Sequence, residues 1–391
     1  MLMRRELRPD VLTHLGPLPV ARFMREVWGR RPLLVRQAFP GLRPPLTRGE
    51  LFALAAREDS EARLVRRDAA GWHLEHGPFP RRDLPALRTP HWTLLVQGVD
   101  LASEAAHRLL ARFRFVPDAR LDDLMISWAS DGGGVGPHVD NYDVFLIQVE
   151  GRRRWRISRQ RDLALLPDVP LKLLANFRPS AEWVLEPGDM LYLPPGVAHD
   201  GVAEGPCMTC SVGFRAPTFA ELLEPWQAAA AEHARLPGRV SDSGRPATLH
   251  AGRLPRDLVT QVHAALSRHR PSAADTERFL LAHLSEPKLQ VIFEPAARAV
   301  DPAAFSRLCA REGLRLDRRS RLLTGRAGLG INGEWLAWPR AGRAILARLA
   351  DYRALAPQEC RALPDPVLTL LAEWAEAGWL HLGATPPEVR A

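Results

Sequence analysis

A histidine and an aspartate two residues apart follow a run of glycines and lead into an apolar segment, in "GGGVGPHVDNYDVFLIQV" (residues 132–149). Side chains alternate between the two faces of a strand, so His138 and Asp140 are expected to project to the same side. The glycines allow the preceding backbone to turn sharply, and Pro137 restricts the approach. An imidazole and a carboxylate on one face are two thirds of a facial metal triad, so a neighbouring strand should supply a third ligand.

A histidine far along the chain is placed to be that ligand. In "LEPGDMLYLPPGVAHDG" (residues 185–201) a turn, an apolar strand and a Pro-Pro-Gly corner lead to His199. A His-x-Asp pair alone also occurs by chance, and His199 alone would suit a loop histidine that caps a turn. Zinc is the main alternative metal, but a structural zinc site would need four protein ligands, often cysteines. We therefore predict that His138, Asp140 and His199 bind a metal with open coordination positions.

The segment that follows the His-x-Asp pair is apolar on both faces, which is typical of a strand within a two-sheet barrel or sandwich. A turn is expected at Glu150–Gly151, after which alternation divides residues 152–157 between two faces. Arg153 would then point inward and need a carboxylate partner, supplied either by a ligand or by an internal Asp or Glu. The expected faces are Phe145, Ile147 and Val149 against Val144, Leu146 and Gln148, then Arg153, Trp155 and Ile157 against a solvated basic face of Arg152, Arg154 and Arg156.

The same alternation gathers further polar residues near the predicted metal. In "DDLMIS" one face carries Asp123, Met125 and Ser127. Tyr142 shares its face with the His-x-Asp pair, and Ser211 lies on the strand after His199. If these faces converge, they form a pocket for a cationic side chain beside an acidic cosubstrate; Met125 would otherwise be an ordinary core residue.

Three regions are expected along the chain. Residues 1–217 show strand and loop signals, and the absence of long helical patterns between the central strands favours an antiparallel sheet. Residues 218–298 show helical periodicity. Residues 299–391 combine a short helix, strands and two further helices, as in a small winged-helix-like module. Arg340, Arg343 and Arg348 in this module would suit DNA binding, but a docking or dimer-supporting role is favoured.

Composition narrows the class of protein. With 46% hydrophobic and 25% charged residues, the 391-residue chain resembles a soluble globular protein, with no apolar run long enough to span a membrane and no secretory signal. Its cysteines are too few for a disulfide scaffold, which favours a reduced, cytoplasmic setting. Cys207 and Cys210 are expected to be packing residues. The net charge of +8 comes almost wholly from arginine, and this bias suggests GC-rich codon usage rather than a function. A basic surface nevertheless attracts polyanions, so it permits a nucleic-acid or ribonucleoprotein neighbourhood.

These motifs, together with "SVGFRAP" (residues 211–217), resemble the bacterial JmjC-type ribosomal oxygenases. The resemblance implies an α+β fold with a double-stranded β-helix (cupin-like jelly-roll) catalytic domain at 1–217, a helical dimerisation region at 218–298 and a winged-helix-like domain at 299–391. It implies Fe(II) as cofactor, with 2-oxoglutarate and dioxygen as cosubstrates. The implied reaction is the hydroxylation of an arginine of the sixteenth large-subunit ribosomal protein. The implied enzyme is a homodimer that binds no membrane and contacts nucleic acid only through ribosome components.

The resemblance also assigns roles to residues. His138, Asp140 and His199 would bind iron, Ser127 and Arg153 would bind 2-oxoglutarate, and the substrate arginine would contact Asp123, Met125, Tyr142 and Ser211. Two features depart from close relatives: Thr209 stands where asparagine is expected, and the chain is basic although its implied substrate is basic too. The alternatives are a JmjC-type lysine demethylase, a hydroxylase of another protein, and a non-catalytic cupin-like metal-binding protein.

Overall fold

The computed structural model describes residues 10–232, 234–241, 243, 246–247, 252–296 and 301–383. The chain forms two compact units, which we describe separately. The first comprises Met1–Ala216, Pro287–Ser320 and Ala341–Ala391, and the second comprises Pro217–Glu286 and Arg321–Arg340. The three-domain division expected from the sequence stays a prediction. Within the described ranges, none of the helices combines the length and the apolar character that crossing a bilayer requires.

The first unit begins with a large antiparallel sheet and its covering helices. Its strands up to residue 216 are β1 (His14–Leu15), β2 (Leu18–Pro19), β3 (Leu33–Val35), β4 (Ala62–Asp68), β5 (Gly71–His76), β6 (Trp92–Val96), β7 (Leu121–Ala129), β8 (His138–Val139), β9 (Val144–Ser158), β10 (Ala181–Leu185), β11 (Met190–Leu193) and β12 (Ala198–Phe214). The helices of this part are α1 (Val20–Glu26), α2 (Arg48–Ala55), α3 (Val99–Ala102) and α4 (Glu104–Ala111).

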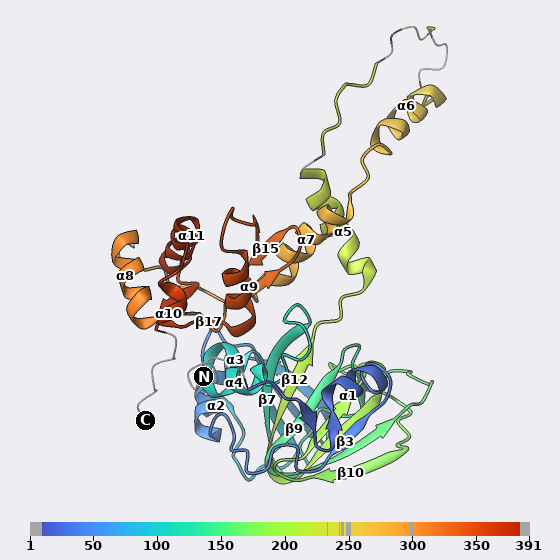
Figure 1. Ribbon diagram of the computed structural model, residues 1–391. Helices are drawn as coiled ribbons and strands as arrows, with labels where there is room; N and C mark the ends of the chain where they lie inside the picture. The colour runs from blue at the N-terminus through green and yellow to red at the C-terminus, as the bar shows by residue number, and fades with distance from the viewer. Residues whose placement is uncertain are drawn as a thin grey trace. The chain divides into compact units, whose positions relative to one another are not determined.

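Ten of these strands form one sheet in the order β3-β11-β9-β12-β7-β6-β4-β5, with β10 paired to β9 and β8 paired to β12. Every pairing in it is antiparallel, as the sequence predicts. The long strands β9 and β12 lie side by side and connect the rest, because each pairs with several shorter strands (Figure 1). This arrangement brings residues 138 and 199 onto neighbouring strands.

Strand β9 corrects one expectation. A turn was predicted at Glu150–Gly151, but the strand continues without a break from Val144 to Ser158. Gly151 has a positive φ of 63°, and the register with β12 shifts opposite it, between Glu204 and Met208. A glycine in the left-handed region allows such a bulge, which bends a strand without ending it. The predicted alternation of Arg153 with its neighbours is retained.

The two faces of β9 contribute to different apolar clusters, as predicted. Phe145, Ile147 and Val149 belong to the larger core, while Val144 and Leu146 belong to a second cluster with Trp155. The helices that cover the outer face of this sheet were not predicted, since only strands and loops were expected there. Helix α1 places Phe23 5.7 Å from the ring of Phe145, and α2 places Phe52 5.5 Å from the ring of Trp128.

The remainder of the first unit is a small α+β module. Its helices are α8 (Pro302–Glu312), α9 (Arg343–Tyr352), α10 (Pro357–Cys360) and α11 (Asp365–Glu376), and its strands β13 (Leu314–Leu316), β17 (Ala354–Leu355) and β18 (Leu380–Leu382) form one sheet in the order β17-β13-β18. Arg343 and Arg348 lie on α9 as expected, whereas Arg340 precedes it. Arg348 pairs with Glu359.

The second unit combines helices with a three-stranded sheet. Its elements are α5 (Phe219–Glu232), α6 (Arg256–Leu266), α7 (Ala273–Ser285), β14 (Leu322–Thr324), β15 (Gly328–Ile331) and β16 (Glu334–Ala337). The sheet packs on α7, because the Glu277 carboxylate accepts hydrogen bonds from the backbone of Arg326 at 2.7 Å and of Ala327 at 2.9 Å. The helices predicted from residue 218 onward are thus present, but the strands between 322 and 337 were expected to belong to a different region, 299–391.

The glycine run before His138 allows both a turn and a close approach of backbones. Gly132 and Gly136 have φ values of 69° and 76°. A methyl group at Gly134 would lie 2.5 Å from the carbonyl oxygen of Gly201 on β12. The segment thus follows β12 more closely than any side chain would allow.

We expect Gly134→Ala to lower the free energy of unfolding by about 1–3 kcal/mol, the usual cost of overpacking. Thermal and denaturant unfolding would measure it. The matched control is Gly49→Ala on helix α2, where the added methyl group meets nothing closer than 4.0 Å and alanine favours the helix. Equal stability of Gly134→Ala and the unaltered protein would contradict this account.

Candidate metal centre and cavity

The three predicted ligands meet at one point. His138 on β8 stands opposite His199 on β12 in the antiparallel register, with ring centroids 4.2 Å apart. Asp140 places its two carboxylate oxygens 3.9 Å from Nε2 of His138 and 3.6 Å from Nε2 of His199. One ligand atom from each of the three residues lies within 4.8 Å of the other two. His138 and His199, which are 61 positions apart in the sequence (199 − 138), are thus brought together by a single strand pairing.

Both imidazoles are oriented by backbone carbonyl groups. Nδ1 of His138 lies 2.9 Å from the carbonyl oxygen of Gly136, and Nδ1 of His199 lies 3.0 Å from that of Val197. A carbonyl oxygen only accepts, so Nδ1 donates in each ring and Nε2 keeps its lone pair toward Asp140. Burial, with the nearby His138, lowers the pKa of His199 to about 4. His199 is therefore neutral near pH 7, the form that binds metals.

The donor set fits a divalent ion with open positions. Two imidazole nitrogens and one carboxylate form a facial triad, and no fourth histidine, cysteine or acidic residue joins the cluster among the described residues. All three residues line a cavity of about 500 Å³ within the sheet. A closed structural zinc site would have a fourth protein ligand instead.

Arg153 points into the same cavity with most of its hydrogen-bonding capacity unused. Its side chain is buried, and Nη1 lies 3.3 Å from the hydroxyl oxygen of Ser127. Nε and Nη2 are buried without a partner among the described residues, and no carboxylate pairs with this guanidinium there. The alternative of an internal Asp or Glu partner is thus wrong for the part of the chain that the structure describes. A buried, unpaired guanidinium fits the carboxylate of a ligand.

The other predicted pocket residues also line this cavity. Asp123, Met125 and Ser127 project from β7 into it, and Tyr142 and Ser211 join them. Burial, with the carboxylates of Asp140 and Asp123, raises the pKa of Tyr142, so its phenol stays neutral. Met125 is a cavity residue rather than ordinary core.

Several cavity residues were missed by sequence reasoning. Arg63 on β4, Gln97 after β6 and Lys172 in the loop before β10 all line the cavity. Lys288 contacts Asp123 from a segment 165 residues away. Arg63 lies in the alternating segment "ARLVRRD", which could have been identified as a strand, but no sequence pattern indicates which strand lies opposite it. Lys288 is one of only two lysines in the sequence, and no sequence pattern indicates its contact with Asp123.

The remaining expectations near the site are met only in part. Arg152, Arg154 and Arg156 do share the face opposite Arg153, but they are not simply solvated: they pair with Glu204, with Glu182 and Glu204, and with Asp200, respectively. The Thr209 hydroxyl donates to Gln148 Oε1 at 2.9 Å and does not line the cavity. Cys207 and Cys210 are buried in two different apolar clusters, as expected of packing residues.

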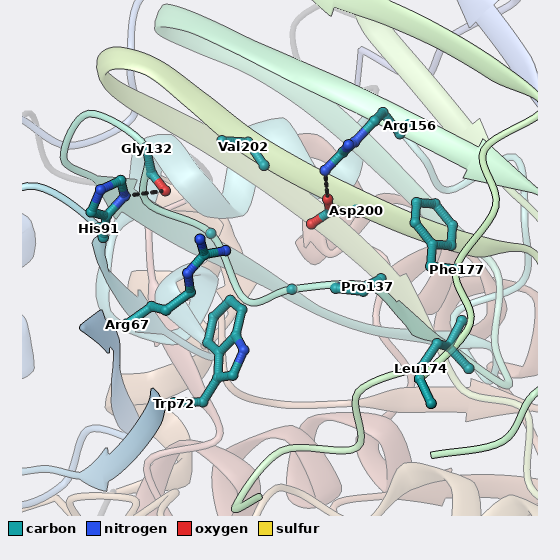
Figure 2. A pocket seen from close by; sticks show the side chains of 13 residues that line it. Arg67, Trp72, His91, Gly132, Pro137, Arg156, Leu174, Phe177, Asp200 and Val202 are labelled. Atoms are coloured by element: carbon teal, nitrogen blue, oxygen red, sulfur yellow. Dashed lines mark hydrogen bonds and ion pairs between the residues drawn. The ribbon is translucent and has the colours of Figure 1, made fainter. Parts of the chain in front are cut away.

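A second cavity of about 450 Å³ lies on the other side of the glycine-rich segment (Figure 2). Gly134, Gly136 and Pro137 line this second cavity, whereas Val135 and His138 line the first, so the segment is a wall between them. Figure 2 shows Arg67 beside Trp72 and the ion pair of Arg156 with Asp200, whose atoms are 2.5 Å apart. Asp200 directly follows the ligand His199.

Comparison with known proteins agrees with these observations. A JmjC domain model matches residues 108–222, and a ROXA-like winged helix model matches residues 267–381. The crystal structure of Escherichia coli YcfD superposes with a TM-score of 0.81 at 30% identity, over 95% of this chain and 100% of that one. The chain belongs to the JmjC-type ribosomal oxygenases. The predicted family, α+β fold class and winged-helix-like module are therefore confirmed.

Two curated relatives are named as a ribosomal protein hydroxylase and a ribosomal oxygenase. The ribosomal protein uL16 3-hydroxylase of E. coli (strain K12) is 42% identical over 202 residues, 51% of this chain and 54% of that protein. A probable ribosomal oxygenase of Haemophilus influenzae is 34% identical over 52% of this chain and 51% of its own length. The matches thus span about half the length of these curated relatives. E. coli YcfD has been solved with cobalt and 2-oxoglutarate, at a TM-score of 0.80, 30% identity, and 94% and 99% coverage. That neighbouring structure thus holds a metal and 2-oxoglutarate, in agreement with the cofactors predicted from the sequence.

We expect substitution of His138, Asp140 or His199 by alanine to weaken binding of cobalt(II) by more than about 10-fold, because even the loss of an outer hydrogen-bond partner costs that much. Isothermal titration calorimetry would measure the affinity. His73→Ala, which removes an exposed imidazole outside the cluster, serves as the control. Unchanged affinity in all three variants would show that the ion binds elsewhere.

Proposed function

We propose that the chain is an Fe(II)- and 2-oxoglutarate-dependent hydroxylase of an arginine side chain in the sixteenth large-subunit ribosomal protein. One observation carries the proposal: the open triad shares its cavity with a buried guanidinium that has no carboxylate partner among the described residues. The 42% identity to a ribosomal protein uL16 3-hydroxylase supports the choice of substrate.

In the proposed site, His138, Asp140 and His199 hold the metal, and Ser127 and Arg153 hold 2-oxoglutarate. The unpartnered Nε and Nη2 of Arg153 form one edge of its guanidinium, which suits bidentate binding of a distal carboxylate. Ser127 fixes the other side of that guanidinium at 3.3 Å. When bound, iron and 2-oxoglutarate supply the oxidation, which turns 2-oxoglutarate and dioxygen into succinate and carbon dioxide while one oxygen atom enters the substrate.

The chain itself contributes orientation and a dry environment. Val144, Leu146 and Trp155 give the cavity an apolar wall that excludes water around the cosubstrate. We assign Asp123, Met125, Tyr142 and Ser211 to the substrate arginine. Among these, Asp123 offers a negative charge to the guanidinium, and the neutral Tyr142 and Ser211 offer hydroxyl groups. The position in which they hold the side chain decides which carbon faces the metal.

Partners follow from the same proposal. A homodimer through residues 218–298 is supported by large apolar side chains that α5 and α6 expose, Phe219 and Leu266 among them. We further propose a cytoplasmic location, where the ribosomal substrate is made, and contact with nucleic acid only through ribosome components.

Mass spectrometry of the purified ribosomal protein, after incubation with enzyme, Fe(II), 2-oxoglutarate and air, tests the reaction. We expect one arginine to gain one oxygen and succinate to form, and Asp140→Ala to abolish both. The control Asp59→Asn removes an exposed carboxylate far from the triad in sequence and stays active. Formaldehyde release from a methylated peptide would favour the demethylase alternative instead, and a metal-loaded protein that forms no succinate would favour the non-catalytic one.

Arg153→Lys should raise the KM for 2-oxoglutarate by roughly 10- to 100-fold, because lysine loses the forked contact to a carboxylate. Steady-state kinetics with varied 2-oxoglutarate would measure it. Arg152→Lys is the matched control, since its side chain lies on the opposite face of β9 and pairs with Glu204. If the two variants share the same KM, Arg153 does not hold the cosubstrate.

A further inference from the structure

The Asp123 carboxylate is held asymmetrically. Its side chain is almost fully buried on β7, and Oδ2 accepts two hydrogen bonds, from the backbone nitrogen of Gly98 at 2.9 Å and from Nζ of Lys288 at 2.6 Å. Oδ1 accepts no hydrogen bond from any described residue. It faces Gly213, where an added Cβ would be 3.7 Å away, and Gly213 lines the cavity. One oxygen is thus fixed by the protein and the other is left for the cavity.

Lys288 belongs to the segment between α7 and α8, outside the large sheet. Its side chain is mostly buried, and Nζ also lies 3.5 Å from Oδ1 of Asp122. Burial alone would lower the pKa of Lys288, but the carboxylates of Asp123 and Asp122 more than offset this and raise it. The ammonium group is therefore charged at neutral pH and lies within ion-pair distance of both carboxyl groups.

Lys288 does not fill the cavity. Asp122 and Asp123 line it, whereas Lys288 is not one of the lining residues. An internal cation that competed with the substrate would have to stand on the cavity side of Asp123. Lys288 contacts Oδ2 without lining the cavity, so it orients the carboxylate and leaves the cavity open.

We propose that Lys288 is a positioning residue for the substrate's cationic side chain, an inference that rests on the proposed function. Because Oδ2 is already bound, Asp123 can offer only Oδ1 to a guanidinium, and the side-by-side pairing of two oxygens with two nitrogens is blocked. A contact through Oδ1 alone favours a different orientation of the guanidinium from a paired contact, and the orientation decides which carbon faces the metal. Lys288 thereby determines how the substrate is presented, although it touches neither substrate nor metal.

The test is Lys288→Ala in the full-length protein, with the sixteenth large-subunit ribosomal protein as substrate. Without the ammonium group, Oδ2 keeps only the hydrogen bond from Gly98, so the carboxylate can turn and the guanidinium bound to it changes its orientation. We expect the KM for the protein substrate to rise, by up to about 100-fold for a misplacement of this kind. We also expect more succinate to form per hydroxylated arginine, because a misplaced side chain is oxidised less often per turnover. The KM for 2-oxoglutarate should stay the same.

Two further variants separate positioning from folding. Lys288→Arg keeps the positive charge and should restore most of the affinity and of the succinate-to-product ratio. Leu289→Ala changes the neighbouring, fully exposed residue and should behave as the unaltered protein. A merely structural role would lower the melting temperature and the amount of active enzyme without changing that ratio.

The outcomes distinguish this inference from the proposed function. If the unaltered protein does not hydroxylate arginine, both fail. If it does, and Lys288→Ala keeps the same KM and the same succinate-to-product ratio, only the role of Lys288 is wrong. A lower KM in Lys288→Ala would also overturn it, since that result would identify Lys288 as a competitor of the substrate.

Discussion

The antiparallel pairing of β8 with β12 is the constraint on which the rest depends. Strand β8 has only two residues, yet its register sets His138 directly opposite His199. The pairing needs a close approach of the glycine-rich segment to β12, which Gly134 permits. Asp140 then follows one residue beyond β8 and completes the cluster. A slip of one residue would turn every side chain of the segment to the other face and separate the ligands.

The cavity beside the triad follows from the same sheet. Strands β7, β9 and β12 each present one face to the interior. Their inward residues include three kinds of polar group that can bind a ligand: a buried guanidinium, a hydroxyl group and a carboxylate. The outer face of β9 is apolar because helices α1 and α2 cover that side of the sheet. The chain's overall charge of +8 says little about this site, since the arginines opposite Arg153 are paired with carboxylates, and Asp122 and Asp123 stand at the cavity. Local pairing, not net charge, governs what binds.

The sequence alone predicts which face of a strand a residue occupies, but not every contact between distant segments. Alternation within a strand is a local property, so the faces of Asp123, Met125, Ser127 and Arg153 could be predicted without knowing the fold. The meeting of His138 with His199 was predictable because both flank strands with recognisable turns. The continuity of β9 was not, since Glu150–Gly151 suits a turn as well as a bulge, and only the pairing with β12 decides between them. Lys288 could not be predicted either: its contact to Asp123 joins residues 165 positions apart and has no periodic signal.

The most direct test of the account is anomalous diffraction from crystals of the protein grown with cobalt(II) and 2-oxoglutarate. We predict one strong peak within bonding distance of Nε2 of His138, Nε2 of His199 and a carboxylate oxygen of Asp140. We also predict that the distal carboxylate of 2-oxoglutarate lies on the unpartnered edge of Arg153. A peak away from these three residues, or one closed by a fourth protein ligand, would contradict it.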